Sequence, residues 1–298
     1  ATQDPVLANR DLSLVRIIQP VDAICDLNVT PQVEVQNLGS QLITSARIEF
    51  IRNGVTIESR RFTLDLETGE TVLATFNPFQ LSAGNNQIEF RIVQVNDLTD
   101  ENPANNSKSS SPVLQGEIAL PYTYAIASFP GDWVISNPDQ SKTWERTNVT
   151  LEGQSTPTVF IRNFDYEAPG QYDYFISPIF DLDKYPNAQL VFEVAHAPYN
   201  QAGYQDALLI SVSEECDSEI DLVNVNYNKA GVRLETSPAT LDEFIPTSNS
   251  QFRTEIFNLK DFQTLGKVRV SIVAQNAFGN NIYLKNIRII PNEDFKYE

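Results

Sequence analysis

Alternation of apolar and polar positions is the strongest pattern in this chain. In the segment PQVEVQN, Val33 and Val35 fall on one face of an extended backbone, and the polar residues between them fall on the other. The segments 46–52 and 87–93 repeat this pattern. A period of two is typical of antiparallel strands that pack one face and expose the other. The first third of the chain is therefore predicted to be a β-sandwich.

Turn signals separate these predicted strands. Asn53-Gly54 stands between two alternating runs and predicts a tight hairpin, and Thr68-Gly69 marks another turn. Turns about ten residues apart favour a seven-stranded immunoglobulin-like sandwich. The polar segment 96–112 then interrupts the pattern and predicts a boundary between domains at 1–115 and 116–298.

The second domain shows the same strand pattern with longer loops. In KVRVSIVA, for example, Val268, Val270 and Ile272 share one face, and the polar residues share the other, which we expect to be wet: Lys267, Arg269 and Ser271. A domain of about 180 residues is large for an immunoglobulin fold and favours a jelly roll. Segments 241–246 and 259–266 are each expected to hold one or two helical turns. The predicted fold class is thus all-β: an immunoglobulin-like β-sandwich followed by a jelly-roll β-sandwich.

Composition narrows the possible partners and chemistry. The chain has 39 acidic residues against 21 Lys and Arg, a net charge of −18, which argues against nucleic acid and anionic membranes and favours divalent cations. A solvated acidic surface explains the same charge. No apolar run reaches the roughly 20 residues of a membrane helix, so no membrane insertion is expected. No signal peptide remains, and the absence of methionine even at position 1 indicates a processed or excised piece of a longer protein.

The single histidine bears on catalysis. His196 has the same strand parity as Leu190, Phe192 and Val194, so we expect a core or loop-base position. Most hydrolytic nucleophiles and catalytic zinc sites need histidine, and no nucleophile-elbow, zinc-protease or phosphate-loop motif occurs, so the chain is predicted not to be an enzyme. A glycosidase needs only two carboxylates, which leaves that activity open. Cys25 and Cys216 are either bonded across the two halves or separate thiols.

Calcium is the cofactor that the acidic loops favour. Calcium binds six to eight hard oxygens, and two loops of the second domain supply candidates at Asp132, Asp139, Asn163, Asp165 and Asp173. A second candidate calcium segment ends the first domain, with Asp97, Asp100, Glu101, Asn102, Asn105 and Asn106. Aspartate and asparagine are also ordinary turn formers, so solvated turns are the alternative for both sets.

Aromatic residues flank two polar loops of the second domain. Tyr166 and Tyr172 flank one loop, and Tyr199 and Tyr204 flank the other, where exposed rings could contact a sugar or a protein. Trp133 and Trp144 are expected to be structural. These four tyrosines are therefore the candidate ligand contacts.

Ordered strings of residues resemble two known families. DLSLVRIIQP, the series Cys25, Pro31, Val33, Val35, Asn37 and Gly39, and DENPANN resemble a CARDB-type domain, an immunoglobulin-like module related to bacterial cell adhesion. FPGDWVISNPD, TWER, YDYFISPIFDL, VFEVAHAPY and GNNIYLKNIRI resemble the choice-of-anchor J or cleaved-adhesin domain, a MAM-like jelly roll. The resemblance implies a non-catalytic module of a Bacteroidota protein exported by type IX secretion, located outside the cell or on the outer-membrane surface.

One position departs from the second family. Related modules usually carry an aspartate, commonly a cation ligand, where this chain has Lys285. One hypothesis is that the Lys285 ammonium takes the place of the cation and pairs with Asp132 or Asp139. A buried lysine must be paired to stay charged. The alternative is that Lys285 points outward into solvent.

These expectations converge on binding rather than catalysis. The leading function is a non-catalytic adhesion or spacer region of a larger secreted or surface-anchored bacterial protein, which binds a protein or glycan through the jelly-roll loops. Its other partners are the neighbouring domains of the same polypeptide. One alternative is a carbohydrate-binding accessory module of an exported hydrolase. Another is a structural subunit that self-associates in a cell-surface assembly.

Overall fold

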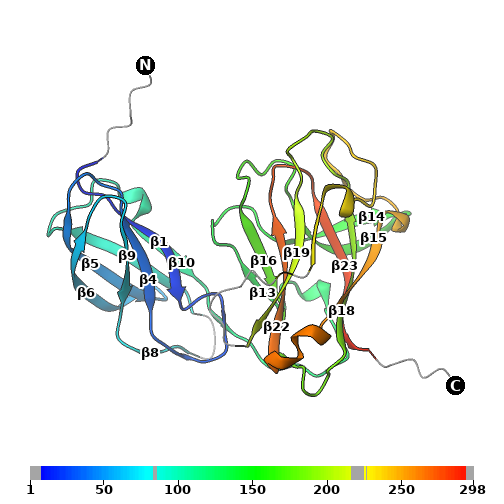
Figure 1. Ribbon diagram of the computed structural model, residues 1–298, viewed down its shortest axis with the longest axis horizontal. Helices are drawn as coiled ribbons and strands as arrows, with labels where there is room; N and C mark the ends of the chain where they lie inside the picture. The colour runs from blue at the N-terminus through cyan, green and yellow to red at the C-terminus, as the bar shows by residue number, and fades with distance from the viewer. Residues whose placement is uncertain (1–7, 83–85, 216–224, 226, 293–298) are drawn as a thin grey trace. The chain divides into compact units, whose positions relative to one another are not determined.

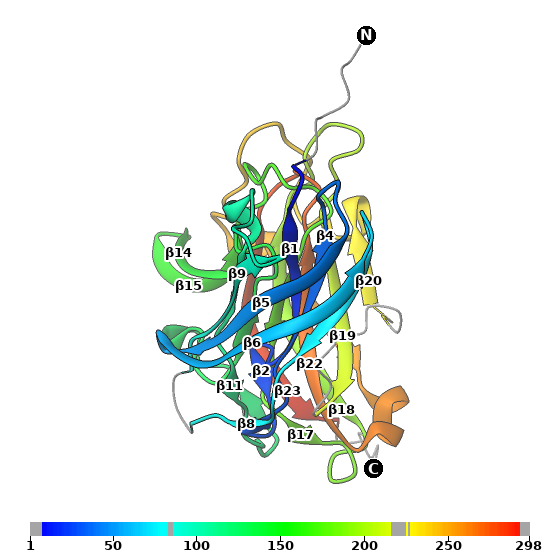
Figure 2. The same cartoon turned by 90° about the vertical axis from the view of Figure 1, so that its left-hand side faces the viewer.

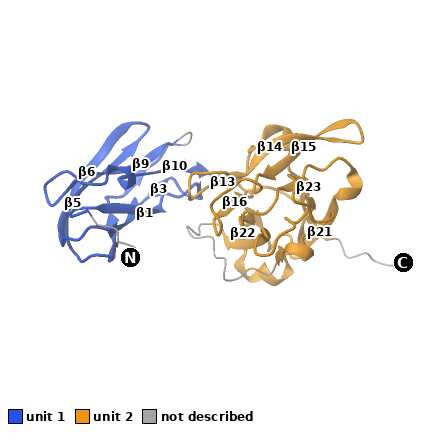
Figure 3. Ribbon diagram, turned by 90° about the horizontal axis from the view of Figure 1, so that it is seen from above, with its two compact units in different colours: residues 1–114 blue, residues 115–298 orange. Residues whose placement is uncertain are grey.

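The chain divides into two compact units, residues 1–114 and 115–298 (Figure 3), one residue from the predicted boundary. The computed structural model describes residues 8–82, 86–215, 225 and 227–292. Each unit is described by itself.

Unit 1 is an all-β sandwich of two main sheets (Figure 1). One sheet has the order β1 (Leu12–Gln19), β4 (Gln32–Asn37), β7 (Thr71–Thr75). The other has the order β10 (Ser107–Ser110), β9 (Ile88–Val95), β5 (Ile43–Arg52), β6 (Val55–Leu66). Two short pairs complete the unit: β2 (Ala23–Ile24) with β11 (Val113–Leu114), and β3 (Asn28–Val29) with β8 (Phe79–Gln80). Figure 2 shows β5 and β6 crossing over β1 and β4.

The inner faces of unit 1 are those that the alternating pattern predicts. Val33, Val35 and Ile48 are fully buried, and they belong to one cluster with Phe50 and Phe90. The hairpin between β5 and β6 is also confirmed, because both residues of Asn53-Gly54 have positive φ, 49° and 76°. The period of two therefore predicts the core of this unit correctly, and the Asn-Gly pair predicts its main turn.

Unit 2 contains two antiparallel sheets of six strands each (Figure 1). The first sheet has the order β14 (Glu145–Leu151), β15 (Gln154–Ile161), β23 (Ile282–Pro291), β18 (Ala188–His196), β21 (Arg253–Asn258), with β12 (Tyr122–Thr123) on β23. The second has the order β13 (Val134–Ser136), β16 (Tyr172–Ile176), β22 (Lys267–Gln275), β19 (Ala207–Glu214), β20 (Tyr227–Ala230), with β17 (Phe180–Asp181) on β22. Side chains from both sheets form one core, which includes Phe175, Phe192, Ile272 and Leu284.

Two local expectations for unit 2 are wrong. The face of β22 expected to be wet is buried at Arg269 and Ser271, which are 3% and 1% exposed, whereas Lys267 at the start of the strand is exposed as expected. This central strand is covered on both sides, and a Gln115 side chain accepts a hydrogen bond from Arg269. Residues 241–246 form no helix, whereas the segment 259–266 contains a short 3₁₀ helix, η5 (Lys260–Leu265).

The remaining helical segments are single 3₁₀ turns. They are η1 (Pro103–Asn105), η2 (Ile126–Ser128), η3 (Gly231–Arg233) and η4 (Asn249–Gln251). Over the described part of the chain, no helix has the length and apolar character needed to cross a bilayer.

Candidate functional site

Four connections of unit 2 meet at one end of the sandwich, which we call the loop end. In the first sheet, Ile161 and His196 both pair with Ile282, so β15 and β18 end where β23 begins. In the second sheet, Tyr172 and Ala207 both pair with Gln275, so β16 and β19 begin where β22 ends. The loop end therefore comprises the connections 137–144, 162–171, 197–206 and 276–281.

A buried carboxylate holds one of these loops. Asp206 is 1% exposed and accepts hydrogen bonds from the backbone N–H groups of Ala277 (2.8 Å), Gly279 (3.2 Å) and Asn280 (2.5 Å). Burial raises the pKa of Asp206 to about 6, against the opposing effect of these N–H donors. The turn 277–280 is thus fixed to the loop 197–206.

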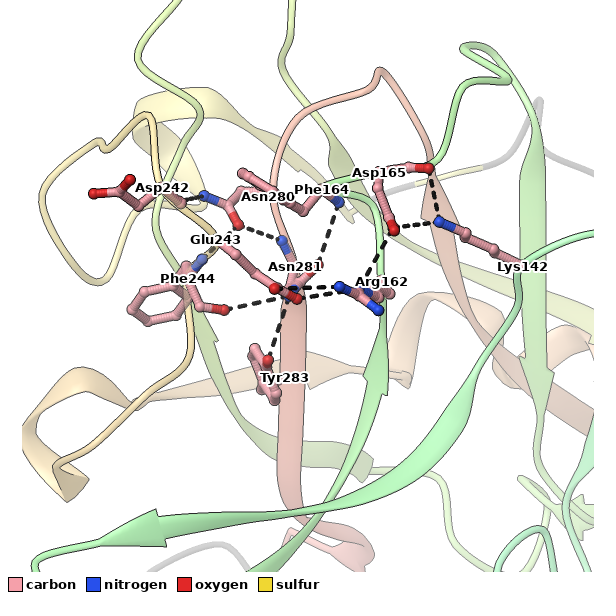
Figure 4. Close-up of polar contacts among 10 residues, drawn as sticks. All are labelled: Lys142, Arg162, Phe164, Asp165, Asp242, Glu243, Phe244, Asn280, Asn281 and Tyr283. Atoms are coloured by element: carbon pink, nitrogen blue, oxygen red, sulfur yellow. Dashed lines mark hydrogen bonds and ion pairs between the residues drawn. The ribbon is translucent and has the colours of Figure 1, made fainter.

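A polar network fixes the neighbouring loops (Figure 4). Asn281 Nδ2 donates to Glu243 Oε1 at 3.0 Å, and the same Glu243 oxygen lies 3.1 Å from Arg162 Nε. Asn281 Oδ1 accepts from the Phe164 N–H at 3.3 Å. Asp165 pairs with Arg162 and with Lys142. The network joins the start of β23 to the segment around 243 and to the loop 162–171.

His196 is part of the interior of this end. It is 1% exposed, and its Nδ1 lies 3.0 Å from the Asn281 carbonyl oxygen, which can only accept, so Nδ1 carries the proton. Burial lowers the pKa of His196 to about 4. The side chain is therefore a neutral core histidine, as its strand parity predicts.

Four aromatic rings form a continuous series at the loop end, which we call the aromatic line. The ring centroids of Phe164 and Tyr199 are 6.2 Å apart, those of Tyr199 and Tyr204 are 5.9 Å apart, and those of Tyr204 and Phe278 are 5.8 Å apart. Each pair is edge to face, and all four residues are partly exposed. Phe278 has φ of 57°, a left-handed backbone that is costly for a bulky residue. The hydrogen bonds of Asp206 flank this strained position.

The structure separates the tyrosines predicted to contact a ligand. Tyr199 and Tyr204 lie in the aromatic line, whereas Tyr166 is only 2% exposed, so the prediction of a ligand contact there is wrong. The Tyr166 hydroxyl instead donates to Asp139. Tyr172 is half-buried beside the outer face of β19 and β22, and its hydroxyl accepts from Gln275 at 2.8 Å. Sequence reasoning missed Phe164 and Phe278, whose loops meet the tyrosine loop only in the folded chain.

The predicted calcium ligands are likewise divided. Asp132 precedes β13, away from the loop end, and accepts from the Tyr122 hydroxyl at 2.7 Å. Asp165 is taken up by its two ion pairs. Asp139, Asn163 and Asp173 do lie at the loop end. Among the described residues, no three Asp, Glu, His or Cys side chains group closely enough to hold a metal by themselves.

Lys285 does not have the partners proposed from the sequence. Its Nζ lies 3.3 Å from Glu193 Oε2, 2.5 Å from Asn249 Oδ1 and 4.3 Å from the ring centroid of Phe252. Pairing with Asp132 or Asp139 is therefore wrong, because Lys285 and Glu193 are cross-strand partners on the outer face of the first sheet. The solvated alternative is also wrong, since Lys285 is 7% exposed beneath the segment that carries Asn249 and Phe252.

The acidic segment of unit 1 makes internal contacts. Asp97 pairs with Arg61 at 2.8 Å, and Glu101 pairs with Arg10 at 2.8 Å. Asp100 is 4% exposed and accepts from the N–H groups of Leu12 and Asn102. The side chains of Asn102 and Asn105 both donate to the Asp11 carboxylate. These contacts attach the segment to the start of β1.

Cys216 lies outside the described residues, so its pairing with Cys25 stays a prediction.

Comparison with known proteins gives a family match for unit 1 and distant structural likeness for both units. Residues 9–110 match the CARDB family. No match was found among curated proteins. The K1 cleaved adhesin domain of Lys-gingipain from Porphyromonas gingivalis W83 is 16% identical, and the match covers 59% of this chain and 100% of that chain with a TM-score of 0.41.

Two further solved structures were found. A CARDB domain of a Pyrococcus furiosus protein, in complex with di-metal ions, is 17% identical over 37% of this chain and 93% of that chain, with a TM-score of 0.29. A carbohydrate-binding module of the β-sandwich superfamily is 12% identical over 95% of this chain and 99% of that chain, with a TM-score of 0.36.

Proposed function

We propose that this chain is a non-catalytic binding segment of an extracellular or cell-surface protein, and that unit 2 binds a glycan through the aromatic line. Supporting this, four partly exposed rings from three loops lie in one series. The apolar faces of sugar rings stack on such aromatic side chains, and tyrosine hydroxyls add hydrogen bonds. The half-exposed Glu243 and Arg162 supply further polar groups beside Phe164.

The proposal of a non-catalytic role rests on the state of the histidine. His196 is buried, neutral and bonded to a backbone carbonyl, so it has no access to a substrate. In this proposal unit 1 is a spacer, in keeping with its match to the CARDB family. The larger protein would be exported to the bacterial surface, for which a type IX pathway is the route that the sequence resemblance implies.

Glycan-array screening of the whole chain, followed by calorimetry with the best ligand, tests this function. Tyr204→Ala and Phe278→Ala should each weaken binding about 10-fold, equivalent to about 1.4 kcal/mol. Ile256→Ala is the matched control, because Ile256 is an exposed apolar residue on β21 outside the aromatic line and should leave the affinity unchanged. Unchanged affinity in both aromatic variants, or an array without any bound glycan, would contradict the proposal.

Light scattering of the same sample tests the self-assembly alternative. A monomer throughout the concentration range used for binding supports the binding segment. Concentration-dependent growth that Tyr204→Ala abolishes would instead identify the aromatic line as a contact between copies of the chain.

A further inference from the structure

Buried polar atoms without partners are concentrated at the loop end. Among the described residues, eleven buried side-chain nitrogen or oxygen atoms have no hydrogen-bond partner, and six of them belong to four residues there. They are both oxygens of Asp173, both polar atoms of Asn163, Asn137 Oδ1 and Thr143 Oγ1. Asp173 and Asn163 are each 0% exposed. Buried polar groups are almost always satisfied, so such a group of orphans indicates a missing ligand.

Strand pairing directs Asp173 and Asn163 into the sandwich. Asp173 pairs with Ala274, whose side chain belongs to the core between the sheets, so the carboxylate enters that core from the second sheet. Asn163 follows the core residue Ile161 by two positions and enters from the first sheet. Both stand at the loop end, Asn163 near the start of the connection 162–171 and Asp173 just after its end.

The loop 137–144 brings the other two oxygens to the same place. Ser136 pairs with Tyr174, so the next position along, Asn137, lies opposite Asp173. Asn137 Nδ2 donates to the Ser141 carbonyl at 2.9 Å, which leaves Oδ1 as its free end. Trp144 Nε1 donates to the Asp173 carbonyl at 3.0 Å and holds the end of the loop against β16. The Thr143 hydroxyl is a direct neighbour of the Asp173 carboxylate.

The Asp173 carboxylate is fully buried, and neither of its oxygens has a hydrogen-bond partner within the geometric limits among the described residues. A second carboxylate, that of Asp139, lies near enough for its charge to act on Asp173. Asp139 itself is held by the Tyr166 hydroxyl and by the Ser141 N–H at 3.1 Å. A buried carboxylate with a second carboxylate beside it requires a cation.

We propose that this cluster binds a calcium ion. The two oxygens of Asp173, with Asn163 Oδ1, Asn137 Oδ1 and Thr143 Oγ1, supply five hard ligands. Calcium takes six to eight oxygens at about 2.3–2.6 Å, so water completes the shell, and Asp139 balances the second positive charge. Magnesium suits the cluster less well, because it demands a smaller octahedron and retains more of its water. The bound ion joins the loop 137–144 to both sheets, and this site does not depend on the proposed glycan contact.

Calcium binding to the whole chain, stripped with EDTA and dialysed, tests the site. Calcium at about 100-fold above its Kd should raise the Tm of unit 2 by about 5 °C or more, and equimolar magnesium by less than half as much. Terbium, a calcium mimic, should luminesce on tryptophan excitation, because Trp144 contacts Asp173 directly. Both tryptophans lie in unit 2, so this signal reports no site in unit 1.

Asp173→Asn should abolish the Tm shift and the terbium signal. Asp165→Asn is the matched control, since it removes an equal charge from the connection 162–171, just before β16, at an exposed, ion-paired position, and it should retain both. Asp139→Asn keeps every direct ligand and should weaken calcium binding about 10-fold, which provides a second variant if Asp173→Asn does not fold. A wild-type chain without Tm shift or terbium signal, signals that persist in Asp173→Asn, or an equal response to magnesium would overturn the assignment.

Discussion

The carboxylate of Asp206 occupies the space that a side chain at position 279 would need. A Cβ atom on Gly279 would lie 2.1 Å from Asp206 Oδ2, and the two residues are joined by the Gly279 N–H bond to the other carboxylate oxygen. Glycine is therefore required here by close approach of a buried anion. The residues are 73 positions apart, so this requirement is created by the fold.

Gly279→Ala should destabilise unit 2 by about 2–3 kcal/mol, because the added methyl displaces Asp206 from its three N–H donors. Urea unfolding followed by tryptophan fluorescence measures this, since Trp133 and Trp144 both belong to unit 2. Gly116→Ala is the control. A Cβ atom at position 116 would meet nothing within 4 Å, so the free energy of unfolding of unit 2 should change little in this variant. Equal stability of the two variants would show that Asp206 can move without cost.

His196 should make unit 2 less stable in acid. Its pKa falls from an ordinary 6.5 to about 4 in the folded chain, so between these values the unfolded chain takes up a proton that the folded chain refuses. The stability is fully present above pH 6.5 and is lost as the pH falls toward 4. Between about pH 7.5 and pH 5 this amounts to about 2 kcal/mol.

His196→Gln removes this contribution, so the loss measured in the wild type should exceed that in the variant by about 2 kcal/mol. The urea midpoints of the wild type and the variant are measured at each pH in EDTA. Taking the difference between the two proteins cancels the titration of all other groups. The same pH dependence in both proteins would mean that the pKa of His196 is the same in the folded and the unfolded chain.

Asp100 should be important for the stability of unit 1. Asp100→Ala leaves the buried N–H groups of Leu12 and Asn102 without acceptors and should cost about 2–3 kcal/mol. Residues 1–114 contain no tryptophan or tyrosine, so far-UV circular dichroism has to follow this transition. Asp97→Asn, which removes an exposed ion pair with Arg61 and keeps a residue type that tolerates the positive φ of 59° at this position, should leave the transition nearly unchanged. A similar effect of both variants would refute the role of the buried acceptor.

Lys285 remains a candidate for an ammonium that replaces a cation, now with Glu193 as its partner. Lys285→Asp places a carboxylate beside Glu193 and should lower the stability of unit 2 by about 3–5 kcal/mol in EDTA. Calcium should then raise the Tm of Lys285→Asp by more than that of the wild type. Lys285→Met has a similar side-chain volume and no added carboxylate, so calcium should raise its Tm by the same amount as that of the wild type. The replacement hypothesis fails if calcium raises the Tm of Lys285→Asp by no more than it raises the Tm of Lys285→Met.

Strand parity in the sequence predicts which side chains enter the cores, because the period of two reports only the face on which a residue lies. Val33, Phe50 and His196 are buried as that period requires. Asp173 has the same parity as the core residue Phe175, but from the sequence it was assigned to a loop, because aspartate is an ordinary turn former.

Parity cannot show which long loop covers the outer face of a sheet. Lys285 alternates outward, as a solvated residue would, but the segment with Asn249 and Phe252 buries it. A bulge at Asn286, with φ of 53°, further shifts the register of β23 against β18. Only half of the aromatic line was predicted from the sequence. Tyr199 and Tyr204 share one loop and were predicted, whereas Phe164 and Phe278 come from other connections that only the strand order brings beside that loop.

The hydrogen bonds of Asp206 restrict how this chain can diversify. The residues that display Tyr204 and Phe278 lie on separate loops, yet the carboxylate next to one loop holds the backbone of the other. Grafting a foreign 197–206 segment into this scaffold would release the 276–281 turn unless an aspartate were retained at its last position. Either loop can therefore be exchanged alone only if position 206 remains an aspartate, and otherwise the two loops have to be exchanged together.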